Sequence, residues 1–336
     1  MMFFYVLGGI LTGFGGALFI VRYGHTLGMI DKPNHRSSHS VATPKGGGIG
    51  ILAAFLIAAL VSGADLFLWL PASVLSLLSL YGDKLHLSQK LRLMAQFICS
   101  AVLVCFAAKN NCCAVSSSAG IPVFLVIPFF ILVMTATANY YNFMDALNGI
   151  AGITGLIAFS CLAFVADKSG SNDLAVICVA VAGACCGFLF LNMTGKVFMG
   201  DGGSILLGFL FAGTAILLSE TLLDIFCYLA FIYPFYADEF ISIILRLSQR
   251  QSLFKAHRGH LCQLLANELN IAHWKVAFIY GLCQLIIILL VQGLRNYGLL
   301  PVVALEIFLL FLTGYCYVLV KRAIRRLHPV GRFLQK

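Results

Sequence analysis

Charged residues are scarce in this sequence. Only 10% of its 336 residues are Asp, Glu, Lys or Arg, whereas 61% are hydrophobic, and the mean hydropathy is +0.97. A soluble globular domain carries about 25% charged residues, so the composition excludes that class. We therefore expect a polytopic membrane protein, whose apolar segments of about 17–25 residues cross the bilayer as helices.

Three features that the sequence lacks narrow the kinds of membrane protein it can be. The first apolar run has no basic region in front of it and no small-residue cleavage site, and Arg22 follows it, so we expect a retained anchor with its N-terminus outside. The twelve cysteines are scattered and form no CxxC pair, which disfavours a disulfide framework or a metal cluster. No internal repeat is visible, which disfavours a transporter built from inverted halves.

Apolar runs organise the chain. They predict an all-α integral membrane bundle of about eleven transmembrane helices, in which Pro234 kinks the ninth. An odd number of crossings puts the two termini on opposite sides. Residues 1–320 are predicted to form one multi-pass domain, followed by a basic cytoplasmic tail at 321–336. The runs are 2–21, 47–62, 66–81, 91–108, 121–138, 150–166, 174–191, 205–220, 222–245, 274–292 and 299–319.

Basic residues indicate which side faces the cytoplasm. Of the 22 Lys and Arg, only Lys109, Lys168 and Arg295 lie in loops that this arrangement puts outside. Cytoplasmic loops carry the excess of basic residues in membrane proteins, so the C-terminus is predicted to be cytoplasmic. The net charge of +9 then faces anionic lipid, which indicates a membrane-lipid partner and no nucleic acid. The long polar loops lie on the same side, where we expect the functional site.

The polar stretch KVFMGDGGS at 196–204 lies between two apolar runs. Glycines flank Asp201 and let a ligand approach the backbone closely, and a carboxylate at a membrane edge usually has a task such as holding a cation. We expect Ser204 to cap the next helix, whose positive N-terminal end attracts anions. With Lys196, the stretch indicates a metal and phosphate site. The alternative is a capped helix with a glycine turn.

Two other predicted inner loops carry polar motifs. The first, at 31–48, offers basic, hydroxyl and glycine groups that suit a phosphate or nucleotide. After the fifth run, Asn142, Asp145 and Asn148 recur every three residues. On a helix they form one stripe of oxygen ligands suited to Mg²⁺. The alternatives are a solvated basic loop for the first motif and an N-cap with a polar turn for the second.

The loop at 246–273 carries two histidines three residues apart, with Arg258 between them. Arginine suits a diphosphate, and no cysteine or carboxylate set accompanies the histidines as a zinc site requires. A solvated basic loop is the alternative. Asp238 and Glu239 lie in the inner half of the ninth run, where an unpaired charge is rare enough to indicate a role. Another predicted inner turn contains Asp83, followed by Lys84. The alternative to a functional role for this acid is a surface ion pair with the lysine.

Five motifs occur in order over almost the whole chain: DKPNHRSSH…TPKGGG at 31–48, GDK at 82–84, NYYNFMDALNG at 139–149, VFMGDGGS at 197–204 and AHRGHLCQ at 256–263. Together they resemble the polyprenyl-phosphate sugar-1-phosphate transferases. That family includes the undecaprenyl-phosphate GlcNAc-1-phosphate transferases and the MurNAc-pentapeptide translocases of peptidoglycan synthesis. The HRGHLCQ form looks more like the O-antigen-initiating branch, which handles N-acetylated 6-deoxyhexosamines, than the peptidoglycan branch.

The resemblance implies a reaction and its setting. An N-acetylhexosamine-1-phosphate passes from a UDP-sugar to undecaprenyl phosphate and UMP is released, which makes 1–320 a catalytic domain. The implied cofactor is Mg²⁺, with Mn²⁺ as a substitute, and a homodimer is compatible with the family. The implied location is the bacterial inner membrane, with the active site on its cytoplasmic face. The implied pathway is O-antigen or cell-envelope polysaccharide synthesis, at its initiating step.

The resemblance also implies roles for particular residues. It assigns catalysis to Asp83, Asp145 and Asp201, and metal binding to Asp201 and Asn142. It assigns substrate binding to Thr43, Lys45, Asn142, Asn148, Asn192, Phe198, His257, Arg258 and His260.

Two positions depart from the family pattern. The family carries an adjacent Asp-Asp where this chain has Gly82-Asp83, and a second acid where it has Asn148. Both differences remove negative charge from the expected site. They leave open a catalytically weakened or inactive homologue that binds a UDP-sugar or assembles with envelope enzymes. A lipid or small-molecule transporter is the second alternative.

Overall fold

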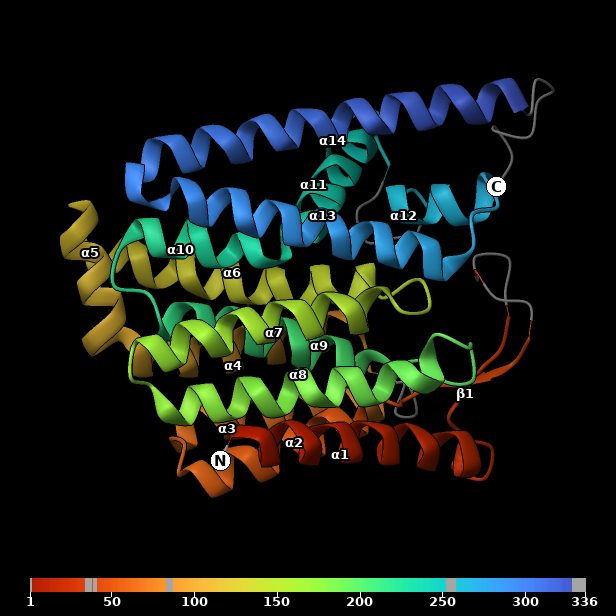
Figure 1. Cartoon of the computed structure of the whole chain (residues 1–336), viewed down its shortest axis with the longest axis horizontal. Helices are drawn as coiled ribbons and strands as arrows, with labels where there is room; N and C mark the ends of the chain where they lie inside the picture. The colour runs from red at the N-terminus through yellow and green to blue at the C-terminus, as the bar shows by residue number, and fades with distance from the viewer. Residues whose placement is uncertain (1, 34–37, 39–40, 83–86, 252–257, 328–336) are drawn as a thin grey trace.

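A computed structural model describes residues 2–33, 38, 41–82, 87–251 and 258–327, and it is almost entirely helical. Figure 1 shows the helices side by side in one bundle. In chain order the elements are α1 (Met2–Tyr23), β1 (Ile30–Asp31), β2 (Thr43–Pro44), α2 (Ile49–Ser62), α3 (Leu66–Gly82), α4 (Gln89–Ala107), η1 (Ala108–Cys112), α5 (Cys113–Ala119), α6 (Val123–Met144), α7 (Ile150–Lys168), α8 (Asn172–Asn192), α9 (Asp201–Leu217), α10 (Leu222–Leu229), η2 (Ala230–Ile232), α11 (Tyr233–Ser248), α12 (Leu261–Gln263), η3 (Leu264–Glu268), α13 (His273–Leu294), η4 (Arg295–Tyr297) and α14 (Leu299–Leu327).

The predicted all-α membrane architecture is confirmed. Each apolar run of the sequence coincides with a helical segment. Among the described residues, eight such segments are long and apolar enough to cross a membrane, and α2, α3 and α9 are shorter apolar helices. Helices suit these runs because every backbone N–H and C=O is then satisfied without water. The number of crossings and the orientation in the membrane stay predictions.

Pro234 lies where a helix is interrupted, as expected from the sequence. The ninth run bends at the short 3₁₀ turn η2, and Pro234 lies in the first turn of α11. Proline has no N–H to donate, so a helix tolerates it in the first turn and breaks before it. The helix α14 continues to Leu327, past the apolar run and into the predicted basic tail.

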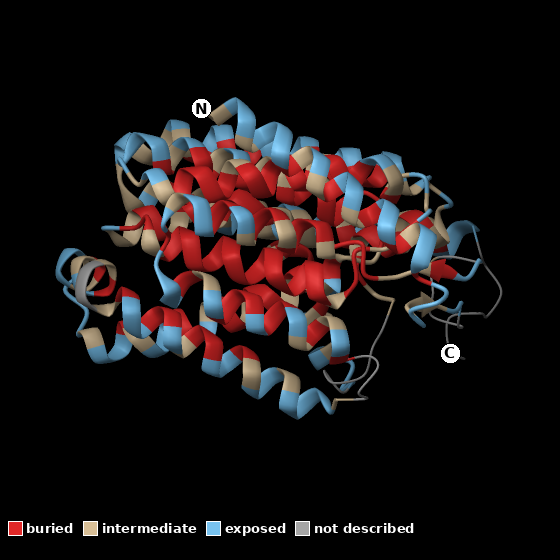
Figure 2. Ribbon diagram, turned by 90° about the horizontal axis from the view of Figure 1, so that it is seen from below, coloured by how far each residue is buried: buried red, intermediate tan, exposed pale blue. Residues whose placement is uncertain are grey.

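The most buried helices are α8 and α9. In α9 every residue from Gly202 to Ile216 is buried, with α3 and α6 packed against it. α8 lies against α1, α2 and α7. Figure 2 shows buried residues in the inner helices and exposed ones around the outside. The exposed residues include large apolar side chains such as Phe3 and Phe311, which a bilayer would cover.

The polar loops gather at one end of the bundle. β1 and β2 pair antiparallel there, with Ile30 opposite Pro44. The turn between α8 and α9, and the short helix α12, lie at the same end (Figure 1). α1 begins at the other end and α14 finishes at this one (Figure 1), as an odd number of crossings requires.

Candidate active site

The glycine-rich ends of two distant motifs form one backbone unit. Lys45 pairs with Phe198 in a parallel bridge, and the two amides after Lys45 both donate to the Phe198 carbonyl, at 3.1 and 2.9 Å. The Gly48 amide donates to Met199 O at 3.0 Å. A Cβ on Gly48 would lie only 2.4 Å from the Gly203 Cα, so the two segments meet this closely because both residues are glycine. The unit carries Lys45 to the start of α9.

Asp201 is the first residue of α9. It follows Gly200, whose φ of 78° favours glycine because other residues are strained there. The prediction that Ser204 caps this helix is wrong, because no side chain caps it. The Ser204 hydroxyl instead donates to Asn142 Oδ1 at 2.6 Å. It thereby ties the end of α6 to the start of α9.

Two cations flank the Asp201 carboxylate. Lys45 Nζ lies 3.1 Å from Oδ1, and Arg92 Nη1 donates to Oδ2 at 2.8 Å. Arginine and lysine are the side chains that bind phosphate oxygens most strongly. The carboxylate and the two cations therefore form a polar cluster that can hold a diphosphate and its counter-ion.

Arg92 was not predicted as a site residue. It lies in the first turn of α4, which Ser88 caps by accepting the Leu91 amide at 3.3 Å. A cation in the first turn opposes the helix dipole, and this was the signal in the sequence. Arg92 reaches Asp201 beside Gly82, where an added Cβ would lie 3.2 Å from the Arg92 Cζ.

Asn142, Asp145 and Asn148 converge on one pocket, although not as one helical stripe. Asn142 lies in the last turn of α6, Asp145 follows the helix with a ψ of 52°, and Asn148 lies in the turn before α7. The predicted stripe is wrong because the helix ends at Met144. The turn nevertheless brings all three side chains to the same space.

The Asn192 side chain connects the turn before α7 with the turn before α9 through two hydrogen bonds. Its Oδ1 accepts the Gly149 amide at 2.7 Å and its Nδ2 donates to the Val197 carbonyl at 2.8 Å. The side chain is 4% exposed, so both ends of its amide serve the backbone. Its role in substrate binding stays a prediction.

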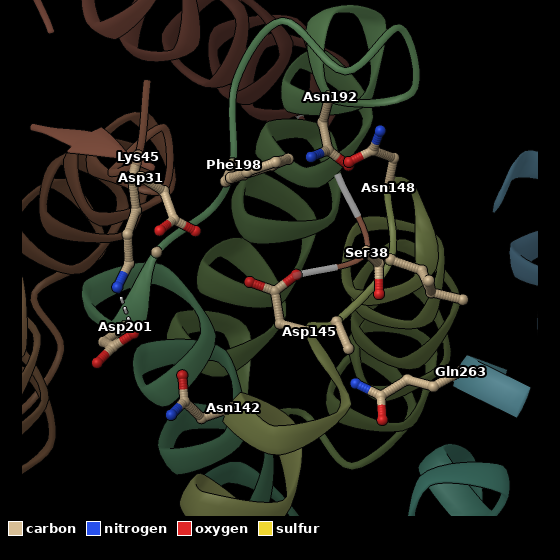
Figure 3. Close-up of a pocket in the computed structure, with 13 residues that line it drawn as sticks. Asp31, Ser38, Lys45, Asn142, Asp145, Asn148, Asn192, Phe198, Asp201 and Gln263 are labelled. Atoms are coloured by element: carbon tan, nitrogen blue, oxygen red, sulfur yellow. Dashed lines mark ion pairs between the residues drawn. The ribbon is translucent and has the colours of Figure 1, made fainter. Parts of the chain in front are cut away.

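These side chains line a polar pocket of about 270 Å³ at the loop end of the bundle. Figure 3 shows Lys45 and Asp201 on one side, Asp145 in the middle and Gln263 on the other. A smaller pocket of about 200 Å³ shares Lys45, Gly200 and Asp201 with it. The larger pocket is lined by Asp31, Ser38, Lys45, Asn142, Asp145, Ala146, Leu147, Asn148, Asn192, Phe198, Gly200, Asp201 and Gln263.

Three polar lining residues lie in the motifs at 31–48 and 256–263 but were not predicted individually as site residues. Asp31 lies in β1, Ser38 in the same loop region, and Gln263 ends α12. Ser38 Oγ accepts from Asn267 Nδ2 at 3.1 Å, so the first loop and the loop before α13 meet at the pocket. Such a contact joins distant parts of the chain, and no local sequence pattern signals it.

Asp145 is a half-buried acid that lines the pocket. Burial, and then the negative charge of Asp201, hold the pKa of its carboxyl well above the ordinary value, while Lys45 opposes the shift. No hydrogen bond to this carboxylate is found among the described residues. A cation bound in the pocket would favour the charged form of this carboxylate.

The donor set suits Mg²⁺. Asp201, Asp145 and Asn142 supply oxygen atoms to one pocket, and hard cations prefer oxygen ligands. Within the described part of the chain, no group of three or more His, Cys, Asp or Glu can enclose a metal. Mg²⁺ is usually held by one or two carboxylates together with substrate phosphates, which fits a pocket of this kind.

Other predicted residues lie away from the pocket or outside the description. Thr43 is buried in β2, where its hydroxyl donates to Val41 O at 3.0 Å. Thr43 and Arg258 are not among the residues that line the pocket. Asp83 and His257 lie outside the described residues. Their predicted roles stay predictions.

His260 is buried between two acids. Its Nδ1 lies 3.4 Å from Glu239 Oε2 and 3.7 Å from Asp238 Oδ1. Burial opposes the charged imidazole, yet the carboxylates outweigh it and raise the pKa of His260 above its ordinary value. The residue is absent from the lining of the pocket, so in this arrangement it supports the loop. Substrate binding by His260 stays a prediction.

Comparisons with known proteins agree with the resemblance. The model of glycosyl transferase family 4 matches residues 66–219. The undecaprenyl-phosphate alpha-N-acetylglucosaminyl 1-phosphate transferase of Yersinia pestis is 28% identical over 92% of this chain and 88% of its own length. Two phospho-N-acetylmuramoyl-pentapeptide-transferases match over shorter segments. That of Prochlorococcus marinus is 34% identical over 39% of this chain, and that of Microcystis aeruginosa is 42% identical over 38%.

The alignments differ in the fraction of each protein that they cover. The shorter alignments span only 38% and 37% of the Prochlorococcus and Microcystis proteins, whereas the Yersinia alignment covers nearly all of both chains. The family model covers the segment that holds Asn142, Asp145 and Asp201, which all line the pocket. The chain is therefore similar to glycosyl transferase family 4 over residues 66–219, and over nearly its whole length to a sugar-1-phosphate transferase that acts on undecaprenyl phosphate.

Proposed function

We propose that this chain transfers an N-acetylhexosamine-1-phosphate from a UDP-sugar to undecaprenyl phosphate. The observation that supports this most directly is the polar cluster of Asp201, Lys45 and Arg92, in which Asp201 and Lys45 line one pocket together with Asp145. It lies at the loop end of a membrane helix bundle, where a water-soluble nucleotide and a lipid phosphate meet. The similarity to these transferases supports the general reaction.

The reaction is a displacement at phosphorus. An oxygen of the lipid phosphate attacks the β-phosphorus of the UDP-sugar, and the bond from that phosphorus to the bridging oxygen breaks. UMP leaves with the bond's electron pair, and undecaprenyl-diphosphate-sugar forms. Lys45 and Arg92 stabilise the negative charge that develops on the phosphoryl oxygens. This is the task for which two cations beside one carboxylate are suited.

Asp201 and Asn142 would hold Mg²⁺, with Asp145 next to them in the pocket. When bound, the cation neutralises the diphosphate and stabilises charge in the transition state. We assign Asp83 to orienting or deprotonating the lipid phosphate. The second pKa of a phosphate monoester lies near neutrality, so a strong base is not required.

We place the reaction on the cytoplasmic face of the bacterial inner membrane. Basic loops at the pocket end support this orientation. An impermeant thiol reagent on intact cells tests it. The exposed Cys113 should react, whereas a cysteine introduced at exposed Thr194 in a Cys113→Ser background should not. Labelling at position 194 from outside would reverse the orientation.

The transfer itself is tested with membranes that contain the chain. They are incubated with undecaprenyl phosphate, Mg²⁺ and labelled UDP-N-acetylhexosamines, and the lipid is then extracted. We expect labelled lipid and released UMP, and neither product when Mg²⁺ is chelated. A failure to label lipid from any UDP-sugar would refute the proposal. A product found only with N-acetylated 6-deoxyhexosamines would support an initiating step of O-antigen synthesis.

A second candidate is a homologue that binds a UDP-sugar without transferring it. It is favoured by the ion pairs that already engage both oxygens of Asp201. The same membranes decide between the two. UDP-sugar binding without any lipid product would support the second candidate.

A further inference from the structure

The side of the pocket opposite Lys45 and Asp201 contains the buried side-chain amide of Gln263. Gln263, the last residue of α12, lines the pocket and is only 8% exposed. Its Oε1 is buried and has no hydrogen-bond partner among the described residues. Figure 3 shows the amide group directed into the pocket. A buried amide that lacks a partner costs free energy, which a bound molecule can return.

Asp238 fixes the segment that carries this amide. Its carboxylate accepts the backbone N–H of Leu261 at 2.8 Å and of Cys262 at 3.2 Å. These are the first two residues of α12, and Gln263 is the third. Asp238 itself is fully buried in α11. The backbone that positions Gln263 is therefore held by a side chain from the membrane bundle.

Two tyrosines fix the Asp238 carboxylate in turn. The Tyr280 hydroxyl of α13 donates to Oδ2 at 2.5 Å, and the Tyr317 hydroxyl of α14 donates to Oδ1 at 2.7 Å. Tyr317 also lies 2.9 Å from the Gly259 carbonyl. Hydroxyl donors from α13 and α14 and backbone donors from α12 thus fix the position of one carboxylate. Supporting contacts of this kind hold a substrate-binding group in place.

We propose that Gln263 contacts the acetamido group of the sugar, and that Asp238 is the positioning residue that aims it. This inference rests on the proposed function. An amide has a donor end and an acceptor end, and so does an acetamido group, so the two can pair reciprocally. A hydroxyl at the same ring carbon leaves one end of the Gln263 amide unmatched. The phosphates bind at Lys45 and Arg92, so the sugar lies toward Gln263.

The test compares matched sugar pairs. Purified protein is given UDP-GlcNAc or UDP-glucose, and UDP-GalNAc or UDP-galactose, and both kcat/KM and Kd are measured. For Gln263→Ala we expect a roughly tenfold to hundredfold loss of preference for the acetamido sugar, the range expected when a buried polar group loses its hydrogen-bond partner. UMP binding should be unchanged. Gln251→Ala is the control, since Gln251 is an exposed glutamine at the other end of the undescribed stretch 252–257.

Asp238→Asn tests the positioning role. It should reduce the same preference mainly through KM, and Asp238→Asn/Gln263→Ala should lose no more preference than Gln263→Ala alone. Tyr280→Phe removes one hydrogen bond and should give a smaller loss of the same kind. A merely structural role would instead weaken binding of both sugars of a pair equally, and that result would overturn the assignment to Asp238.

The outcomes separate the two proposals. Unchanged preference in folded Gln263→Ala, with folding checked by UMP binding, overturns the inference about Gln263. Preferential binding of acetamido sugars by a wild-type protein that transfers none supports the inference and overturns the transferase. A wild-type protein that binds no UDP-sugar overturns both.

Discussion

Asp201 and Asp238 are both aspartates held by several donors, yet the two regions around them differ. The Asp201 side chain is 21% exposed, opens on the pocket and is paired with two full cations. The Asp238 side chain is 1% exposed and is held by tyrosine hydroxyls and backbone amides. The two cations at Asp201 can bind a phosphate in place of the carboxylate. The buried donors around Asp238 have no access to a ligand. The first region is thus built to bind a ligand and the second to hold the backbone.

The largest expected effect is the loss of transfer activity in the Asp201→Asn variant. The substitution keeps the size of the side chain and removes the negative charge that we propose holds Mg²⁺. We expect at least a hundredfold loss of kcat/KM, roughly 2.7 kcal/mol of barrier. The thermal unfolding midpoint should hardly change, because partly exposed ion pairs contribute little to stability. Near-normal turnover would remove Asp201 from the centre of the site.

Asp238→Ala should show the opposite pattern. It leaves two buried hydroxyls and two backbone amides without their hydrogen-bond acceptor, so we expect a loss of about 3 kcal/mol in the free energy of unfolding. Thermal unfolding of the solubilised protein without ligand measures this, with Asp201→Asn as the comparison. Equal midpoints for the two variants would contradict the division into a binding region and a supporting region.

Arg92→Ala should lower kcat/KM about tenfold, roughly 1.4 kcal/mol of barrier. Arg92 supplies one of the two charges at Asp201, and Lys45 remains. Lys90→Ala is the control, because Lys90 is exposed in the same first turn of α4. Equal losses in the two variants would mean that general charge, and not the contact with Asp201, is responsible.

Gly82→Asp should cause a smaller loss of transfer. Its Cβ would lie 3.2 Å from the Arg92 Cζ, so the guanidinium must shift, and the new carboxylate competes with Asp201 for it. We expect a loss of a few fold, and none in an Arg92→Ala background, measured as kcat/KM. A tenfold gain would show that an acid at position 82 assists the reaction.

The smallest effect concerns pH and His260. Because the pKa of His260 is raised in the fold, its contribution to stability is complete below the ordinary pKa of 6.5 and is lost as pH rises through the raised value. The difference in unfolding midpoint between the wild type and His260→Gln should therefore shrink from pH 6 to pH 8. His25→Gln, at an exposed position, is the control for replacing a histidine.

Much of the fold and part of the site could be read from the sequence. Each apolar run became helical because long apolar segments must satisfy their own backbone in a bilayer. Lys45, Asn142, Asp145, Asn148, Asn192, Phe198 and Asp201 were predicted for the site and all line one pocket. The errors were local. The helix before Asp145 ends too early for a polar stripe, and Ser204 bonds to Asn142 instead of capping α9.

The sequence by itself determined the membrane class, the order of the helices and the motifs that mark the superfamily. Apolar length, glycine and charge act within short segments, so they leave a local pattern. Only the tertiary structure decided that Arg92 meets Asp201, that Asn192 fastens two turns and that Gln263 faces the pocket. Each of these contacts joins segments far apart in the chain, and its geometry depends on how whole helices pack against one another.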